Sequence, residues 1–431
     1  MTIIERLRQY KELDPHKIAL IVDDKKYTYG DLYDAILSID INDTSRIVNV
    51  AQTKESPKHI VALIQSQSFV KQLVQWLGVL YTGYIPMVCH NEMDTEYVEE
   101  LARIIAYKGV APLADFGVLT SGTTGRPKPL WRSESSWREF FDIQNDIFHI
   151  NKDTKIFLHG SFSFTGVSNM VIAVLWSGGT VITTSSLRPN RWIQLIEEYH
   201  VDHIYALPTK LRLLVRHCKS KVDSINYIIA GSQVLDRQLM EQLERICPNM
   251  EFILYYGATE LNYITYCTGK EWLDREGTVG RPFPSVRIEE QNGVIYVTTK
   301  HHIEGIPDIY TVNDCGYIDK DGYLMFHGRK GDVINKGGYK ISIPEMELYL
   351  QSLQGVSEVA VITINDDIRG EDFVAYMVLE NNTELSKIIE IIHHERPSVE
   401  WPKAILEIPM LPLTECSKVD KRKLKEWYNK G

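Results

Sequence analysis

The sequence lacks several features that would by themselves assign a functional class. Its six cysteines lie far apart, and no pair has the spacing of a zinc ribbon, a thioredoxin motif or a haem attachment site. Internal repeats and low-complexity runs are absent. Basic residues are outnumbered, with 47 Lys+Arg against 57 Asp+Glu, which argues against a nucleic-acid-binding protein. A local phosphate site of backbone amides and one or two lysines remains compatible with this charge.

Long apolar segments are missing as well. The most apolar stretch, residues 60–88, is interrupted by Lys71 and by glutamine and glycine, so we expect no membrane span. The first residues are charged and contain no apolar signal-peptide core. The sequence therefore predicts a cytoplasmic protein with reduced thiols.

The composition is that of a globular protein. The 431 residues are 44% hydrophobic and 24% charged, and a chain of this length is expected to form two or more domains. In the middle of the chain, short β-branched or aromatic runs alternate with amphipathic segments of helix length. The expected strands are residues 180–184, 203–207, 227–231 and 252–257, and the expected helices are residues 191–199, 210–218 and 235–246. This alternation predicts a mostly parallel sheet covered by helices, with ligands at the carboxyl ends of its strands.

The pattern changes after residue 277 to short strands and turns, followed from about Asp332 by a compact α+β unit. The predicted fold class is α/β and α+β. We expect a large N-terminal domain, residues 1–328, with mostly parallel sheets, covering helices and a small β region. Residues 329–431 form the expected smaller C-terminal α+β domain.

The strongest local signal is the segment of residues 120–128, TSGTTGRPK. Its glycines allow tight turns, its hydroxyls and amides can surround phosphate oxygens, and Lys128 adds a positive charge. The spacing is not that of a Walker loop. A solvated Ser/Thr/Gly loop would explain the segment equally well if it stood alone.

Further motifs follow in order. They are YYGATE at residues 255–260, NDCG at 313–316, GRKGD at 328–332, GYKIS at 338–342, PEME at 344–347 and PLTECSKVD at 412–420. This series, over nearly the whole chain, resembles the adenylate-forming superfamily. That superfamily includes acyl-CoA synthetases, luciferases, aryl-acid AMP ligases and the adenylation domains of peptide synthetases.

The resemblance implies ATP and Mg²⁺ as cofactors and a set of nucleotide-binding residues. Those expected to bind the nucleotide are Thr120, Ser121, Gly122, Thr123, Thr124, Gly125, Lys128, Gly231, Ser232, Tyr256, Gly257, Asp314 and Arg329. Within this set Tyr256 would stack on adenine, and Asp314 and Arg329 would hold the ribose. Alone, Tyr256 reads as a core tyrosine at a strand end.

The expected catalytic residues are Thr259, Glu260 and Lys418. Thr259 would contact the α-phosphate, Glu260 would hold Mg²⁺, and Lys418 would stabilise charge that develops as the acid attacks. Outside this context Glu260 and Lys418 would read as surface charges.

The resemblance also implies a two-step reaction with a mobile C-terminal domain. A carboxylate attacks the α-phosphorus of ATP, and a thiol then displaces AMP from the acyl-adenylate. The hinge corresponds to Gly331, where the family usually has Asp or Lys, and Gly338, Tyr339 and Lys340 would reach the thiol tunnel. The acceptor would be coenzyme A or the phosphopantetheine of a carrier protein.

The acid is indicated by the segment SFSFT at residues 161–165, which resembles the SFSFD of peptide-synthetase domains. Thr165 replaces the aspartate that pairs with an amino acid's ammonium group, so an α-amino acid is disfavoured. The expected pocket wall is aromatic and polar. Its residues are Phe164, Thr165, Ser168, Tyr205, Ser232, Gln233 and Tyr255.

These residues favour a small aromatic acid of the hydroxybenzoate type, as in siderophore assembly. A medium- or long-chain fatty-acyl-CoA synthetase remains an alternative, in which Thr165 merely fills volume in an alkyl tunnel. A catalytically inactive nucleotide-binding homologue is a third reading. The joint presence of Glu260, Asp314, Arg329 and Lys418 argues against that third reading.

Overall fold

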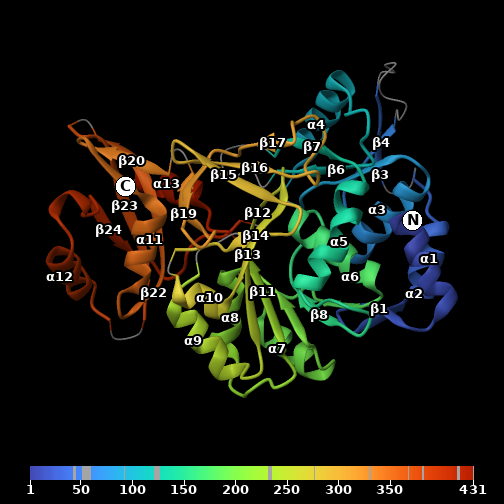
Figure 1. Ribbon diagram of the computed structural model, residues 1–431, viewed down its shortest axis with the longest axis horizontal. Helices are drawn as coiled ribbons and strands as arrows, with labels where there is room; N and C mark the ends of the chain where they lie inside the picture. The colour runs from blue at the N-terminus through green and yellow to red at the C-terminus, as the bar shows by residue number, and fades with distance from the viewer. Residues whose placement is uncertain are drawn as a thin grey trace.

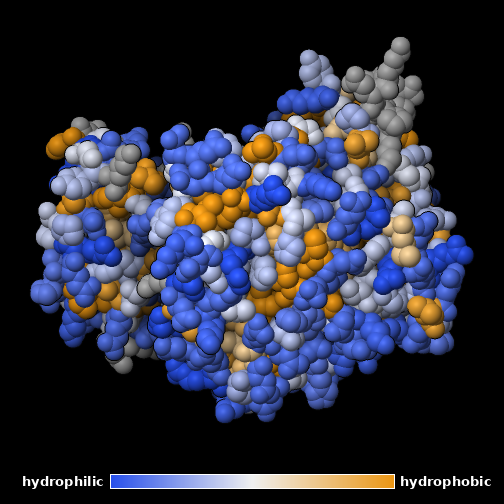
Figure 2. Space-filling model, viewed as in Figure 1, coloured by the Kyte–Doolittle hydropathy of each residue, from blue (hydrophilic) through white to orange (hydrophobic). Residues whose placement is uncertain are grey.

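The computed structural model describes residues 1–41, 45–50, 60–91, 93–120, 127–231, 235–275, 277–329, 332–366, 368–380, 383–414 and 418–430. These residues form helices packed on four sheets (Figure 1). Hydrophobic residues gather near the middle of the face drawn in Figure 2, whereas its periphery is largely hydrophilic. No helix in the described ranges combines the length and the apolar character needed to cross a membrane.

The largest sheet has nine strands in the order β14-β13-β12-β11-β10-β8-β9-β1-β2. These strands are β1 (Ile18–Val22), β2 (Lys25–Thr28), β8 (Lys155–Leu158), β9 (Thr180–Thr183), β10 (His203–Tyr205), β11 (Tyr227–Gly231), β12 (Glu251–Ala258), β13 (Asn262–Thr268) and β14 (Arg281–Pro282). The neighbours from β12 through β1 pair in parallel, and β2, β13 and β14 add antiparallel edges. The predicted mostly parallel sheet is therefore present.

A second sheet has five strands, and its last two, β6 and β7, flank the segment of residues 120–128 in the chain. Its order is β3 (Ser45–Asn49), β4 (Ile60–Ile64), β5 (Ile85–Val88), β6 (Phe116–Leu119) and β7 (Pro129–Arg132). The helices of the large N-terminal part are α1 (Ile3–Leu13), α2 (Tyr29–Leu37), α3 (Phe69–Tyr81), α4 (Thr95–Lys108), α5 (Ser135–Ile147), α6 (Thr165–Ser177), α7 (Pro189–Glu198), α8 (Pro208–His217), α9 (Arg237–Ile246) and α10 (Gly269–Asp274). Local signals set several starts: Thr28 and Asp31 form a capping box that begins α2.

The third sheet is the small β region expected after residue 277. It contains β15 (Arg287–Gln291), β16 (Val294–Thr298), β17 (Ile309–Tyr310), β18 (Asp314–Ile318) and β19 (Leu324–Arg329). The β18–β19 hairpin carries Asp314 at its start and Arg329 at its end, and these two residues pair across the ladder. The pairing thus brings together two residues that the sequence places in separate motifs.

The C-terminal part has its own sheet and core. Its elements are β20 (Val333–Lys336), β21 (Tyr339–Ser342), α11 (Ile343–Ser352), β22 (Val356–Asp366), β23 (Gly370–Leu379), α12 (Leu385–Glu395), a short 3₁₀ helix (Ser398–Glu400), β24 (Ala404–Glu407) and α13 (Lys421–Lys430). Two buried hydrophobic clusters consist of residues from Ile334 onward. Figure 1 shows this part, in orange and red, at one end of the molecule. The mixed architecture confirms the predicted fold class, whereas the division at residues 328 and 329 stays a prediction.

Candidate functional site

A cavity of about 900 Å³ opens where several strand ends meet. Its wall takes residues that follow β6, β8, β10 and β12 and residues from the first turns of α6 and α8. This is the edge at which open α/β sheets bind ligands. Arg329 from the end of β19 and Lys418 from the C-terminal part complete the wall. The cavity therefore lies between the two parts of the chain.

Many of the predicted site residues line this cavity. They are Thr120, Lys128, Phe164, Thr165, Tyr205, Tyr255, Gly257, Thr259, Glu260, Arg329 and Lys418. Several predicted residues lie outside the described residues: Ser121, Gly122, Thr123, Thr124, Gly125, Ser232, Gln233 and Gly331, together with the side chain of Lys340. A position in the cavity wall does not by itself test what a residue does. The individual roles of the residues in both groups therefore stay predictions.

The two ends of the phosphate-loop segment are held together. The amide of Thr120 donates to the carbonyl of Lys128 over 3.0 Å, and the amide of Lys128 donates to the Thr120 hydroxyl over 2.9 Å. These bonds extend the β6–β7 ladder by one more pair. Both bonds fix the backbone of Lys128, a residue that lines the cavity.

The Thr259–Glu260 segment lies between β12 and β13 and is fixed by a residue that sequence reasoning missed. Arg132, fully buried, donates to the Thr259 carbonyl over 2.7 Å and also to the Ser136 hydroxyl and the His301 carbonyl. Burial lowers the pKa of Arg132 to about 9, although the carboxylate of Glu260 opposes that shift. The surrounding sequence, WRSESS, gave no sign of burial, since it is rich in polar residues.

Asp314, Arg329 and Tyr256 form one polar cluster beside the cavity. The carboxylate of Asp314, only 3% exposed, accepts hydrogen bonds from the Tyr256 hydroxyl and, over 2.9 Å, from Arg329 Nε. Burial raises the pKa of Asp314, with these hydrogen bonds opposing the shift. The Tyr256 ring packs tilted against Phe326 at 5.4 Å between centroids. Neither Asp314 nor Tyr256 is among the residues that line the cavity, so their predicted ribose and adenine contacts remain proposals.

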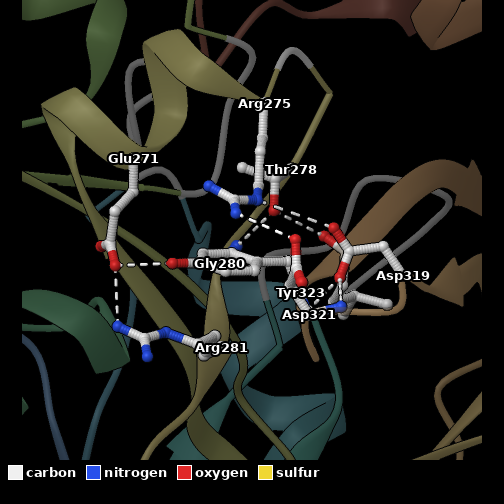
Figure 3. A network of polar contacts seen from close by, with 9 residues as sticks. Glu271, Arg275, Thr278, Gly280, Arg281, Asp319, Asp321 and Tyr323 are labelled. Carbon is white, nitrogen blue, oxygen red and sulfur yellow. Dashed lines mark hydrogen bonds and ion pairs between the residues drawn. The ribbon is translucent and has the colours of Figure 1, made fainter.

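A polar network fixes the turn of the hairpin that carries Asp314 and Arg329. The Tyr323 hydroxyl donates to Glu271 over 2.6 Å, and Arg281 forms an ion pair with the same carboxylate at 2.7 Å (Figure 3). Arg275 lies over the Tyr323 ring and pairs with Asp321 at 3.1 Å. The network ties α10 and β14 to the β18–β19 turn.

The C-terminal part contributes Lys418 to the cavity wall. The Thr414 amide donates to the Lys418 carbonyl over 2.8 Å, and a bridge joins Leu413 to Val419. Gly338 lies instead in the β20–β21 turn, and Tyr339, which begins β21, is 63% exposed. Gly338 has a φ of 96°, a conformation that favours glycine. This orientation brings Lys418, and not the predicted thiol-tunnel segment, to the cavity.

The wall predicted to receive the acid is largely aromatic. The rings of Tyr205 and Tyr255 stack with centroids 5.9 Å apart, and their hydroxyls share a hydrogen bond of 2.6 Å. Burial raises the pKa of Tyr205 well above its usual value, so this hydroxyl stays protonated. Gly231, the last residue of β11, lies close to the backbone of Tyr255. A Cβ at Gly231 would be only 2.4 Å from the Tyr255 carbonyl oxygen.

The structure differs from the sequence prediction at Ser168. Its hydroxyl bonds back to the carbonyls of Phe164 and Thr165, each at 3.2 Å, and Ser168 does not line the cavity. A serine within the first turns of a helix commonly makes such local bonds. Phe164 and Thr165 do line the cavity, and the Phe164 ring stacks on His90 at 4.8 Å.

Three further residues of the acid wall were absent from the sequence prediction: His159, Asn169 and Lys210 all line the cavity. The sequence carried no motif that singled them out. Lys210 lies three residues after Leu207, the N-cap residue of α8, and its ammonium donates to the His159 carbonyl over 2.5 Å.

The residues present fit ATP and Mg²⁺. Lys128, Arg329 and Lys418 supply positive charge around one cavity, which suits a polyphosphate. The carboxylate of Glu260 offers the hard oxygen donors that Mg²⁺ prefers. The arrangement can therefore bind a nucleotide beside a pocket for a second, largely aromatic or polar molecule.

Comparisons with known proteins agree with this geometry. The model of the AMP-binding enzyme family matches residues 116–295, and that of the AMP-binding enzyme C-terminal domain matches residues 345–418. An uncharacterized acyl–CoA ligase of Bacillus subtilis (strain 168) is 28% identical over 329 residues, covering 72% of this chain and 68% of its own. A protein of Staphylococcus haemolyticus whose proposed activity is that of a long chain fatty acid–CoA ligase is 24% identical, covering 100% and 99% of the two chains.

Solved structures share the fold. The ATP-bound structure of MatB from Rhodopseudomonas palustris matches with a TM-score of 0.81 at 19% identity, covering 99% of both chains. The o-succinylbenzoate coenzyme A synthetase of Bacillus subtilis, in complex with ATP and magnesium ion, matches with a TM-score of 0.79 at 19% identity. This match covers 97% of this chain and 99% of the synthetase chain.

Proposed function

We propose, from the premise that this chain belongs to the adenylate-forming superfamily, that it joins a small aromatic carboxylic acid to a thiol in two steps. The enzyme is an adenylate-forming ligase that uses ATP and Mg²⁺. The acid, the thiol and the residue roles below are our proposal.

In the first step the acid's carboxylate attacks the α-phosphorus of ATP, and pyrophosphate leaves. Lys128 binds the outer phosphates, and Thr259 contacts the α-phosphate. Lys418 neutralises the charge that grows on the α-phosphate and carboxylate oxygens as the new bond forms, which lowers the barrier. Glu260 would hold Mg²⁺, which supplies charge neutralisation on the phosphates when it is bound.

In the second step a thiol attacks the acyl carbon, and AMP leaves. We propose coenzyme A as the thiol, because two relatives, which cover 72% and 100% of this chain, carry CoA ligase names. A phosphopantetheine carrier protein is the other acceptor. This step requires rotation of residues 329–431 about Gly331, which withdraws Lys418 and brings Gly338, Tyr339 and Lys340 to the thiol.

The acid is a flat ring with polar substituents, as in the hydroxybenzoates of siderophore assembly. The support is the stacked pair of Tyr205 and Tyr255, the neighbouring Phe164 and the uncharged Thr165 at the cavity wall. Aromatic walls suit a flat ring, and buried hydroxyl and amide groups are costly to leave unpaired by an alkyl chain.

The single observation that carries the proposal is the presence of Lys418 in the same cavity as Glu260 and Arg329. The test is acid-dependent exchange of pyrophosphate into ATP across benzoates, fatty acids and amino acids, followed by thioester detection with coenzyme A. We expect exchange with hydroxylated benzoates. Absence of exchange with every acid would overturn the proposed activity.

A long-chain fatty-acyl–CoA ligase is the second candidate. It is favoured by the Staphylococcus haemolyticus relative, which covers the whole chain. Exchange with palmitate and none with any benzoate would promote this candidate.

A further inference from the structure

A buried histidine lies between the phosphate-loop segment, residues 120–128, and the acid wall. His90 is 8% exposed and follows β5, and Thr120 directly follows β6, the parallel neighbour of β5. His90 Nδ1 lies 3.0 Å from Ser163 Oγ, and His90 Nε2 lies 3.4 Å from the Thr120 carbonyl oxygen. The His90 ring also stacks on the Phe164 ring, with 25° between their planes. A single side chain therefore contacts the first residue of the phosphate-loop segment and the segment that enters α6.

These contacts join loops from two sheets. β5 and β6 belong to the five-stranded sheet, whereas Ser163 and Phe164 follow β8 of the nine-stranded sheet. Thr120 and Phe164 both line the cavity, and His90 contacts each of them. Loops at the carboxyl ends of strands are where α/β sheets bind ligands. His90 thus links the predicted phosphate site to the predicted acid site.

The Thr120 end of this link is tied to Lys128. The reciprocal hydrogen bonds between Thr120 and Lys128, of 3.0 and 2.9 Å, hold the two ends of the phosphate-loop segment together. A displacement of Thr120 therefore carries the backbone of Lys128 with it. Because Lys128 is the residue proposed to bind the outer phosphates, a nucleotide that fixes Lys128 also fixes the carbonyl that His90 contacts.

The Ser163 end is held by a buried polar network. Ser163 Oγ lies 2.9 Å from Ser161 Oγ, and the buried side chain of Gln72 accepts from the Ser161 hydroxyl and the Phe162 amide, each over 3.1 Å. The Gln72 amide also donates to Asn91 Oδ1 over 3.0 Å. A satisfied buried network favours one arrangement of its members. Residues 161–163 are therefore held against residues 90 and 91 at two points.

The His90 ring is uncharged near pH 7. Burial lowers the pKa of His90, and the bond to the Thr120 carbonyl opposes this shift only in part. In a neutral imidazole one nitrogen donates and the other accepts. Because a carbonyl oxygen only accepts, the Thr120 contact assigns the hydrogen to Nε2, and Nδ1 accepts from the Ser163 hydroxyl. His90 therefore holds two loops together and does not neutralise phosphate charge.

We propose that His90 is a positioning residue through which nucleotide binding at Thr120 and Lys128 and acid binding beside Phe164 strengthen each other. This inference rests on the proposed function, since it assigns both ligands to the same cavity. A ligand that holds one loop reduces the freedom of the other through His90, so the second ligand loses less entropy on binding. Such coupling is reciprocal, with one factor for both ligands.

The first test needs no acid. Saturating α,β-methylene-ATP should slow amide hydrogen exchange in residues 161–164 of the parent protein by about tenfold. Residues 151–154, a loop that precedes β8 at the other edge of the sheet, are the internal reference. Absence of this protection in the parent protein would overturn the inference.

Variants separate the link from folding. His90→Phe keeps a ring against Phe164 but loses both polar contacts, and Ser163→Ala removes one partner, so both should lose most of the protection. His90→Gln, which has an uncharged donor and acceptor, should restore part of it. His203→Phe is the matched control, since His203 is 3% exposed and begins β10 away from the cavity. Full protection in both His90→Phe and Ser163→Ala, or equal loss in His203→Phe, would overturn the inference.

Kinetics give a second readout. In pyrophosphate exchange with 2-hydroxybenzoate or palmitate, raising ATP should lower the KM for the acid about tenfold in the parent protein and leave it nearly constant in His90→Phe. If this KM falls equally in both proteins, the inference fails and the ligase activity stands. If no acid supports exchange but nucleotide protection of residues 161–164 still depends on His90, the proposed function fails and the role of His90 stands.

Discussion

The guanidinium of Arg132 donates a hydrogen bond of 2.7 Å to the carbonyl oxygen of Thr259, 127 residues later in the chain. The amide of Ile303 likewise donates to the Glu260 carbonyl over 2.8 Å. Both bonds hold the backbone of the segment that presents Thr259 and Glu260 to the cavity. Arg132 is therefore a positioning residue for this segment.

Arg132→Lys should reduce kcat for pyrophosphate exchange by about tenfold and raise the Mg²⁺ concentration needed for half-maximal rate. A lysine cannot span the three acceptors that the planar guanidinium reaches, so the segment shifts. Exchange measured over a magnesium series checks this, with circular dichroism to establish folding. An unchanged magnesium dependence in a folded variant would contradict the positioning role.

Lys418→Ala should lower acid-dependent pyrophosphate exchange by about a hundredfold or more, because one transition-state contact is lost. Thioester formation from preformed acyl-adenylate should be spared, since that step uses the other domain orientation. Lys423→Ala, at an exposed lysine of α13, is the control. Exchange at the parental rate would remove Lys418 from the reaction.

Glu260→Gln should weaken metal-dependent turnover and leave the fold intact. The amide keeps the size of the side chain but loses the charge that a hard cation prefers. The measurement is the rate over a range of Mg²⁺ concentrations, with Glu198→Gln on the surface as control. Identical magnesium dependence in Glu260→Gln and the parent would exclude this residue from the metal site.

Thr165→Asp should reduce the use of hydroxylated benzoates by about tenfold or more, because a carboxylate would be placed unpaired on the cavity wall. In the parent protein, hydroxylated benzoates should support exchange better than palmitate, and free amino acids should support none. Kinetics across the three acid classes test this. Robust exchange with palmitate alone would reject the aromatic pocket.

Glu271→Gln should lower the free energy of unfolding at pH 7 by about 1 kcal/mol. Burial alone would raise the pKa of Glu271, but bonds from Tyr323 and Thr268 and the charge of Arg281 outweigh it and lower the pKa. A carboxyl with a lowered folded-state pKa stabilises the protein above its unfolded value of 4.5 and loses this effect as pH falls through the folded-state pKa. Urea unfolding should therefore show the variant and parent converging in acid, and a constant difference at all pH values would contradict this.

The sequence by itself determined the family and the fold class, and both are confirmed; the residues that line the cavity also fit the ATP and Mg²⁺ that the resemblance implies. The reason is that these properties reside in short motifs and in local periodicity. Residues 120–128 and 255–260, for example, carry their turns and chemical groups in contiguous segments. The alternation of strands and helices between residues 180 and 257 is likewise a local pattern, because the spacing of apolar residues in each segment predicts which of them are buried.

The tertiary structure alone decided which other side chains join the site. Arg132 reads as polar surface in the sequence, and Lys210 as one charge on an amphipathic helix, yet both are buried against carbonyls far away in the chain. Ser168 reads as a pocket residue, but its hydroxyl is used by its own helix. Burial and hydrogen-bond partners depend on how distant segments pack, and no local pattern encodes that packing.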